Sequence, residues 1–377
     1  MLEDFIYRSV VTGIEVGKKL TTLFYDEGYS TSYYLGCSTG GRQGFKLAQD
    51  FPDELDGIVA GAPAINFIGL LSWSAHFYGI TGPTGSDTWL PQDKWSLVHD
   101  EILRQCDKLD GAKDGILEDP SLCRPNMTSI QCSAGSSSSN CITAAQVNTV
   151  HQVFEPLRST NGSVLYPRMQ PGSEIAAAEG VYNGQPFPFS RDWWKYVVYN
   201  PSWNATTWTV KDADVAFRQN PYNAQTWKSD LSPLRDSGTK LLHYHGLMDS
   251  LVSSADSKWY YHRVMQEMGL RPEQVDEFYR FFTISGMAHC HGGDGAHAIG
   301  NVASALAGTD PEENVLMAMV QWVEEGIPPE TVRGTRPADE SKTSVEWHHK
   351  HCRYPRRNVY KGPGGPHDED AWECVMP

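Results

Sequence analysis

The N-terminal part of the chain alternates between helical and extended patterns of hydrophobic positions. Apolar side chains recur about every fourth position over residues 2–25, which predicts an amphipathic helix. A short apolar run at 32–35 predicts a buried strand, and a glycine-rich turn follows it. Residues 42–51 again have helical character, and 56–61 predicts a second, parallel strand. This order of elements is typical of an α/β fold.

The pattern changes after residue 70 and returns near residue 236. Eight of the twelve tryptophans lie between Trp73 and Trp227, among loops rich in glycine, proline and serine. No alternation of strands and helices is visible there, so we expect an inserted lid domain over 71–235. The catalytic domain would then consist of two parts, 1–70 and 236–377.

The second part of the expected catalytic domain returns to α/β patterning. Strands are predicted at 240–245 and 278–284, and helices at 254–268 and 312–325. The tail after about residue 333 shows no such period, and we expect it to be loop-like. The fold class is therefore predicted to be α/β with one large insertion.

Composition narrows the class of protein further. Of the 377 residues, 40% are hydrophobic and 11% aromatic, which is enough for a substantial core. There are 46 acidic and 31 basic side chains, and this net charge of −15 argues against binding nucleic acid or an anionic membrane surface. The longest apolar runs are too short to span a bilayer. We expect neither kind of partner, and the oligomeric state stays open.

Cysteines and glycosylation triplets favour an oxidising, extracellular destination. The even number of eight cysteines is compatible with four disulfides, and acceptor triplets begin at Asn126, Asn161 and Asn204. The first residues, however, lack the charged and apolar segments of a secretory signal. The composition thus predicts a secreted protein, although this chain shows no export signal.

Gly36-Cys37-Ser38-Thr39-Gly40 matches the G-x-S-x-G pattern of a nucleophile elbow, between a predicted strand and a predicted helix. The glycines allow a sharp turn that presents the Ser38 hydroxyl as a nucleophile. The backbone N–H of Thr39 would then point to where an oxyanion forms. Taken alone, the pentapeptide is also compatible with an ordinary glycine-rich connection.

A serine nucleophile needs a base, and the base needs an acid that orients it. Asp249 follows the predicted strand at 240–245, and His289 follows the strand at 278–284. Both would lie at the carboxyl ends of parallel strands, as Ser38 does. The chain order Ser, Asp, His is also that of α/β-hydrolases. The sequence therefore predicts a catalytic triad of these three residues.

Two cysteines adjoin members of this triad, since Cys37 precedes Ser38 and Cys290 follows His289. A disulfide between them would hold their Cα atoms about 6 Å apart. One residue adds about 3.8 Å at each end, so Ser38 and His289 would lie within roughly 14 Å of each other. The pairing would bring the nucleophile and the base into catalytic range.

These residues together resemble the CS-D-HC signature of the tannase and feruloyl esterase family. Its three parts are Cys37-Ser38, Asp249 and His289-Cys290. The segments 36–44 and 57–64 are also similar to that family, and the resemblance covers essentially the whole chain. It implies an α/β-hydrolase fold with a lid, and a secreted serine carboxylesterase acting on esters of phenolic acids.

Within the family, the resemblance favours a feruloyl esterase, because Thr39 and Gln43 stand where tannases tend to carry acidic residues. The implied substrate is a small hydroxycinnamic ester or a feruloylated polysaccharide of plant cell walls. Two alternatives stay open. One is a tannase acting on gallate esters, and the other is an inactive relative that only binds glycans or phenolics.

A cluster of candidate metal ligands lies in the expected lid, at residues 107–116. Its carboxylates and glycines would let oxygen atoms converge on Ca²⁺, although by spacing alone a solvated acidic turn is about equally plausible. The resemblance implies a structural calcium ion here. Its ligands would be Asp107, Asp110, Asp114 and the carbonyl oxygens of Ala112 and Ile116.

We expect four disulfides in all. Besides Cys37–Cys290, the expected pairs each join cysteines that are close in sequence. They are Cys106–Cys123, Cys132–Cys141 and Cys352–Cys374.

A zinc site is a competing interpretation of the histidines. His243-x-His245 and His289-x-His291, with Asp249 nearby, contain ligands that zinc prefers. We expect alternate histidines on a strand to point to opposite faces, so that neither pair would serve one metal. A glycan-binding protein rich in tryptophan and calcium is a further alternative, but it would have no use for a Ser-Asp-His set.

The position of Ser38 near the start of the chain departs from the family pattern. α/β-Hydrolases normally have several strands before the nucleophile and take a second oxyanion donor from an upstream loop. We therefore expect the early strands of the sheet to be missing from this chain, as in an N-terminally truncated family member. We also expect the chain, expressed as given, to fold poorly and to have low activity.

Overall fold

The structure is a computed structural model and divides into two compact units. It describes residues 1–133, 138–302, 308–339 and 344–377. Unit 1 comprises residues 1–65, 221–246 and 257–377, and unit 2 comprises 66–220 and 247–256. Unit 2 therefore contains most of the segment 71–235 that was expected to form a lid.

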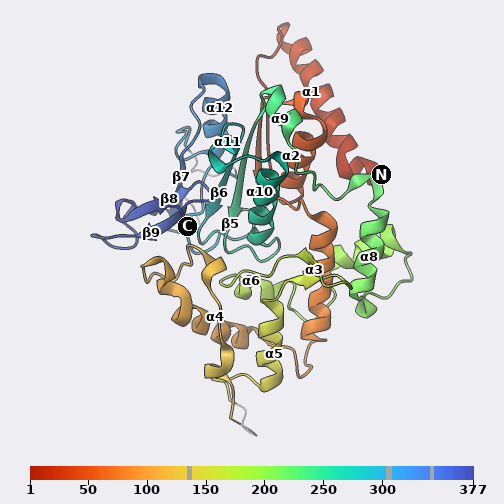
Figure 1. The fold of residues 1–377 in the computed structure, drawn as a ribbon, viewed down its shortest axis with the longest axis vertical. Coiled ribbons are helices and arrows are strands. Elements are labelled where there is room, and N and C mark those ends of the chain that lie inside the picture. Colours follow the sequence, from red (N-terminus) through yellow and green to blue (C-terminus); the bar gives the residue numbers. More distant parts are fainter. Residues whose placement is uncertain (134–137, 303–307, 340–343) are drawn as a thin grey trace. The chain divides into compact units, whose positions relative to one another are not determined.

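Unit 1 is built around a sheet of four parallel strands (Figure 1). These are β1 (Tyr33–Cys37), β2 (Gly57–Gly61), β5 (Lys240–Gly246) and β6 (Tyr279–Ile284), arranged in the order β1-β2-β5-β6. Cys37 pairs with Gly61, and Gly61 with Tyr244, so the carboxyl ends of three strands are level. The positions of the predicted strands are thus confirmed, and their shared edge is where residues after each strand can meet. The expectation that the strand at 32–35 is buried was wrong, because β1 is the end strand of this sheet and Leu35 is exposed.

Helices cover both faces of this sheet. They are α2 (Thr39–Asp50), α9 (Ser232–Ser237), α10 (Ser254–Met268), α11 (Pro272–Val275) and α12 (Val315–Glu325). Ile58 of β2 belongs to a core cluster with Phe45 of α2 and Tyr261 of α10, whereas the next residue, Val59, packs in a second cluster with Met319 of α12. Because successive strand residues point to opposite faces, the sheet lies between α2 and α10 on one side and α12 on the other.

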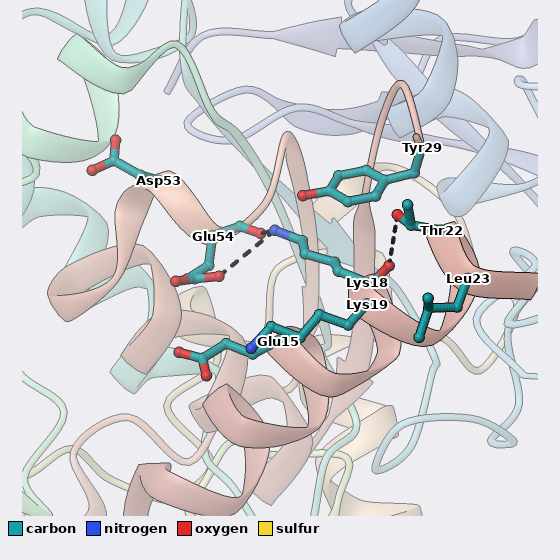
Figure 2. A pocket seen from close by; sticks show the side chains of 8 residues that line it. All are labelled: Glu15, Lys18, Lys19, Thr22, Leu23, Tyr29, Asp53 and Glu54. Carbon is teal, nitrogen blue, oxygen red and sulfur yellow. Dashed lines mark hydrogen bonds and ion pairs between the residues drawn. The ribbon is translucent and has the colours of Figure 1, made fainter. Parts of the chain in front are cut away.

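The helix α1 (Ser9–Tyr25), preceded by one π-turn at Asp4–Arg8, confirms the predicted N-terminal helix but contains no buried residue. Its more N-terminal apolar residues pack partly against the first core cluster. Leu20, Leu23 and Phe24 are 59%, 78% and 81% exposed. A hollow of about 850 Å³ lies beside this helix. Figure 2 shows its lining side chains, among which Lys18 reaches the backbone carbonyl of Glu54. The residues that line it do not include Ser38 or His289.

The C-terminal tail was predicted to be loop-like, and this prediction was wrong. It forms an antiparallel hairpin, β7 (Thr331–Pro337) with β8 (Val345–Cys352), and a second pair, β9 (Arg357–Tyr360) with β10 (Trp372–Val375). These strands are rich in arginine, histidine and glutamate, so no alternation of apolar and polar residues marks them. Their regularity comes from pairing with one another, and β7 and β8 also contact residues 293–298, which the sequence pattern does not reveal.

Unit 2 is mainly helical. Its helices are α3 (Phe67–Thr81), α4 (Gln92–Cys106), α5 (Ala144–Val153), α6 (Glu174–Glu179), α7 (Pro188–Trp193) and α8 (Val210–Gln219), and its short strands are β3 (Leu157–Arg158) and β4 (Val164–Tyr166). Trp95 stacks on Tyr182 with ring centroids 4.9 Å apart, and Phe77 meets the same ring edge-on. Trp73, Trp95 and Trp194 are at most 1% exposed. These tryptophans therefore form the core of the unit rather than a glycan-binding surface.

Among the described residues, no helix combines the length and hydrophobicity needed to cross a membrane.

Candidate active site

Ser38 occupies a sharp turn between the end of β1 and the start of α2. Its backbone has φ 64° and ψ −119°, a conformation that costs energy for a residue with a side chain. Small neighbours make the turn possible: a Cβ atom added at Gly41 would come within 2.2 Å of the Gly61 carbonyl oxygen. The carbonyl of Ser38 accepts the N–H groups of Arg42 and Ala64 at 3.0 and 3.2 Å. The strain is thus held by the surrounding backbone, as in a nucleophile elbow.

The structure brings Ser38 and His289 together. Nε2 of His289 lies 2.8 Å from Oγ of Ser38, a hydrogen-bond distance. His289 comes from the loop after β6, at the same edge of the sheet as Ser38. The ring nitrogen is therefore placed where a base that takes the hydroxyl proton must be.

A disulfide joins the neighbours of these two residues. Cys37 and Cys290 are bonded, and their Cα atoms are 5.9 Å apart. Asn301 donates a side-chain hydrogen bond to the carbonyl of Cys290, which fixes the following part of the loop. The bridge ties the end of β1 to the histidine loop across 253 positions of the chain.

The other three disulfides also join the cysteines expected from the sequence. They are Cys106–Cys123, Cys132–Cys141 and Cys352–Cys374, and the described residues contain no free cysteine. The first two lie in unit 2 and the third ties β8 to β10 in unit 1.

Asp249 lies in the turn that follows β5 and is 1% exposed. One of its carboxylate oxygens accepts the backbone N–H groups of Leu251 and Val252 at 2.8 and 2.9 Å. These bonds hold the carboxylate in one orientation. Asp249 belongs to unit 2 and His289 to unit 1, so the pairing of the two side chains stays a prediction.

Thr39 is the first residue of α2. The first N–H groups of a helix have no acceptor within the helix and carry its positive dipole end. The backbone N–H of Thr39 therefore has the local environment that an oxyanion donor needs. Its role in catalysis remains a prediction.

The histidines of the competing zinc interpretation are used differently. His243 and His245 are two positions apart on β5 and reach the same residue, Ser257, whose hydroxyl lies 2.9 and 2.7 Å from their ring nitrogens. The expectation that they point to opposite faces was wrong, because residues two apart share a face of a strand. The other nitrogen of His243 bonds the hydroxyl of Tyr279. The argument against a zinc site is therefore that these ring nitrogens bond Ser257 and Tyr279, and not that the two side chains point to opposite faces of the strand.

The acidic loop at 107–116 is wrapped by its own backbone. Asp107 accepts the N–H of Gly115 at 2.9 Å, and Asp110 accepts those of Ala112 and Glu118 at 2.9 and 3.2 Å. Burial raises the pKa of Asp110 to about 7, and the carboxylates of Glu118 and Asp114 add to this rise.

The oxygen donors of this loop suit a hard cation such as Ca²⁺, which would offset the charge of the buried carboxylates. Among the described residues, however, no group of three or more His, Cys, Asp or Glu side chains is arranged to hold a metal ion. A calcium site in this loop would therefore also need the backbone carbonyl oxygens of Ala112 and Ile116, which are among the ligands expected from the sequence.

Unit 2 also contains a buried acid that the sequence did not single out. Asp256 is 1% exposed and accepts a hydrogen bond from Nδ2 of Asn66 at 3.1 Å, while Asn66 also donates to the carbonyl of Leu165. Burial raises the pKa of Asp256 to about 8, and the bonds from Asn66 oppose this rise only in part. No sequence signal could have revealed it, because the two partners lie 190 positions apart.

We expect this acid to make stability fall as pH rises. Its pKa is about 4 in the unfolded chain and about 8 in the folded one, so the folded state binds the proton more tightly between these values. This stability is fully present below pH 4 and is lost as the pH rises toward 8. Melting temperatures from pH 5 to 8 should fall less steeply in Asp256→Asn than in the exposed-site control Asp93→Asn. Parallel profiles would contradict this expectation.

The strained serine, its histidine partner and the level strand ends define a serine-hydrolase site on an α/β-hydrolase fold. A comparison with protein-family models matches residues 1–375 to "Tannase and feruloyl esterase". The chain belongs to this family, whose feruloyl esterase members are carboxylic ester hydrolases.

Two curated relatives are similar over the whole chain. This chain is 70% identical over 376 residues to "Probable feruloyl esterase B" of Emericella nidulans, and the match covers 100% of this chain and 71% of that protein. It is 64% identical over 377 residues to "Probable feruloyl esterase B-2" of Aspergillus terreus, covering 100% of this chain and 72% of that one.

Solved structures of esterases are also similar to this chain over nearly its whole length. An esterase from Aspergillus oryzae matches with a TM-score of 0.98 and 61% identity, over 99% of this chain and 74% of that one. Feruloyl esterase B from the same species matches with a TM-score of 0.96 and 55% identity, with the same coverage. Tannin acyl hydrolase from Aspergillus niger, at 23% identity and a TM-score of 0.79, shares the fold.

Proposed function

We propose that this chain is a serine carboxylesterase of the feruloyl esterase type, which hydrolyses esters of hydroxycinnamic acids. The observation that carries the proposal is the 2.8 Å contact between Ser38 and His289, held by the Cys37–Cys290 bridge. The relatives named feruloyl esterase B, at 70% identity and below, support the choice of substrate class. An inactive binding protein would not need this contact or the strained serine that makes it.

The reaction follows from the geometry of the site. Oγ of Ser38 attacks the ester carbonyl carbon while Nε2 of His289 takes the hydroxyl proton. The N–H of Thr39 stabilises the negative charge on the carbonyl oxygen. His289 then passes the proton to the departing alcohol oxygen, which leaves an acyl group on Ser38. Water gives a proton to the same ring and attacks this acyl group. His289 then returns that proton to Oγ of Ser38 as the bond to the phenolic acid breaks, which restores the free enzyme.

Asp249 has a supporting part in this proposal. An acid next to the base keeps the imidazole in the tautomer that accepts the serine proton and stabilises the imidazolium that forms. The bonds from Leu251 and Val252 orient its carboxylate for this purpose.

The choice between feruloyl esterase and tannase can be tested directly. We expect kcat/KM for methyl ferulate to exceed that for methyl gallate at least about tenfold, since a pocket that discriminates such groups does so by roughly 1–3 kcal/mol. Thr39 and Gln43, where tannases tend to carry acidic residues, support this direction. Turnover of the two esters by the purified protein decides it. A preference for gallate would assign tannase activity, and no turnover of either ester would contradict the proposal.

We further propose an extracellular role on feruloylated plant polysaccharides. Four disulfides favour an oxidising compartment. The acceptor residues Asn126, Asn161 and Asn204 are all exposed. A fall in mass after enzymatic removal of N-linked glycans from the protein secreted by a eukaryotic host would support this role, and an unchanged mass would leave the triplets as ordinary loops.

Calcium in the 107–116 loop is proposed as a structural ion. It would neutralise buried carboxylates, and binding to the folded state alone raises stability, by about 2.7 kcal/mol at a hundredfold excess over Kd. We expect the melting temperature to rise with CaCl₂ and fall with chelator in the wild type and in the control Asp93→Asn. Asp110→Asn should respond much less. If the melting temperatures of all three proteins stay the same with CaCl₂ and with chelator, the loop is an ordinary acidic turn.

A further inference from the structure

The loop that carries His289 has little regular structure of its own. Between the end of β6 and residue 301, it forms isolated backbone bridges and no longer strand or helix. Its tip is a tight turn in which the N–H of Ala288 bonds the carbonyl of Gly292 at 2.9 Å. Met287 and Gly293 pair as the two stems of this turn. The position of His289 at the tip therefore depends on what holds each stem.

One stem continues directly from β6, and the disulfide of Cys290 holds the tip. The other stem, residues 293–298, bonds the residues just after β6, since the N–H of Gly295 donates to the carbonyl of Gly286 at 3.0 Å. It also lies against the C-terminal hairpin, whose two strands the sequence pattern did not predict. Ala298 and Thr335 of β7 exchange backbone hydrogen bonds of 3.0 and 2.9 Å. Arg336 of β7 donates to the carbonyl of Gly293.

Two buried residues of the hairpin, His351 and Gly334, lie next to the backbone carbonyl of Ala296 in this stem. Nε2 of His351, a residue of β8 that is 1% exposed, lies 2.9 Å from the carbonyl oxygen of Ala296. Since a carbonyl only accepts, this nitrogen carries the proton. Gly334 of β7 leaves the room for this contact, because a Cβ atom there would lie 1.9 Å from the Ala296 oxygen and 2.7 Å from Nε2 of His351.

We infer that His351 and Gly334 are positioning residues for His289, and that the C-terminal hairpin is the brace of the histidine loop. The inference rests on the proposed function, in which His289 is the base. The hairpin fixes residues 293–298, their pairing with Met287 fixes the turn, and the turn fixes the imidazole at 2.8 Å from Ser38.

A loss of this brace should therefore slow catalysis without weakening substrate binding. His351→Phe keeps a planar ring but removes the donor to Ala296, and Gly334→Ala pushes the stem away. We expect kcat to fall at least about tenfold in both, with KM changed by no more than about twofold, because small displacements of a catalytic group cost large factors in rate. His351→Gln keeps an N–H group and should recover most of kcat. Gly365→Ala, where an added Cβ meets nothing within 4 Å, is the matched control and should keep wild-type kcat.

Hydrogen exchange gives a readout that does not depend on ester hydrolysis. Amides of residues 285–301 should exchange faster in His351→Phe and Gly334→Ala than in the wild type and Gly365→Ala, while those of β2 stay unchanged. Arg336→Met, at a partly exposed position, is the milder variant if the two buried changes prevent folding, and it should show the same effects at smaller size. Unchanged exchange in 285–301 or an unchanged kcat in the folded variants would overturn the inference. If the wild type hydrolyses no ester, the proposed function fails, and exchange alone then decides whether the hairpin braces the loop.

Discussion

Replacing Ser38 by alanine is expected to abolish ester hydrolysis while leaving the fold intact. The hydroxyl is the only part of the residue that the mechanism uses, and its Oγ lies 2.8 Å from the proposed base. Loss of the nucleophile in a serine triad typically lowers kcat by about 10⁴- to 10⁶-fold. Rates of methyl ferulate hydrolysis, measured beside the melting temperature of each protein, test this expectation.

The control is chosen to separate chemistry from folding. Ser30→Ala changes an exposed serine eight positions before the nucleophile and should keep full activity. His289→Gln should lose about as much activity as Ser38→Ala, and the double variant should lose little more, since the two groups act as one unit. Substantial hydrolysis by Ser38→Ala would mean that another residue is the nucleophile.

The elements around the site could be predicted because their patterns are local and strong. β2 is buried along its whole length, and α2 and α12 have clear amphipathic spacing. The Ser38–His289 contact could be anticipated for a different reason: each residue adjoins a cysteine, and the bridge converts a distant pair into neighbours. The glycines around Ser38 leave the room that the sharp turn needs.

Other parts of the site could not be predicted, because their partners are distant and their residue types are ambiguous. The strands of the C-terminal hairpin look polar, and their role near the site depends on contacts with residues 293–298, such as that of His351 with Ala296, 55 positions away. The Tyr279–His243–Ser257 chain joins three elements through buried side chains, and its histidines resemble metal ligands until these bonds are seen. The bond between Asp256 and Asn66 could not be predicted for the same reason, because the two residues lie 190 positions apart.

Removing the Cys37–Cys290 bridge is expected to lower both stability and kcat. The double variant Cys37→Ser/Cys290→Ser frees the tip of the histidine loop from β1 and leaves its two stems and the bond from Asn301 to position His289. Loss of a disulfide typically costs about 2–5 kcal/mol, and this one closes the longest loop of the four in the chain. A displacement of the base by about 1 Å should lower kcat roughly 10²-fold.

A second bridge provides the matched comparison. Cys132→Ser/Cys141→Ser opens a loop of unit 2 that spans only nine positions, so it should cost less stability and leave kcat unchanged. Rates measured well below each variant's melting temperature separate the two effects. The structure holds His289 through the chain from β6, through the disulfide and through the hairpin, and the disulfide is the cross-link that this variant removes. If the Cys37/Cys290 variant kept wild-type kcat once folded, the other two attachments would be sufficient, and the bridge would serve stability rather than catalysis.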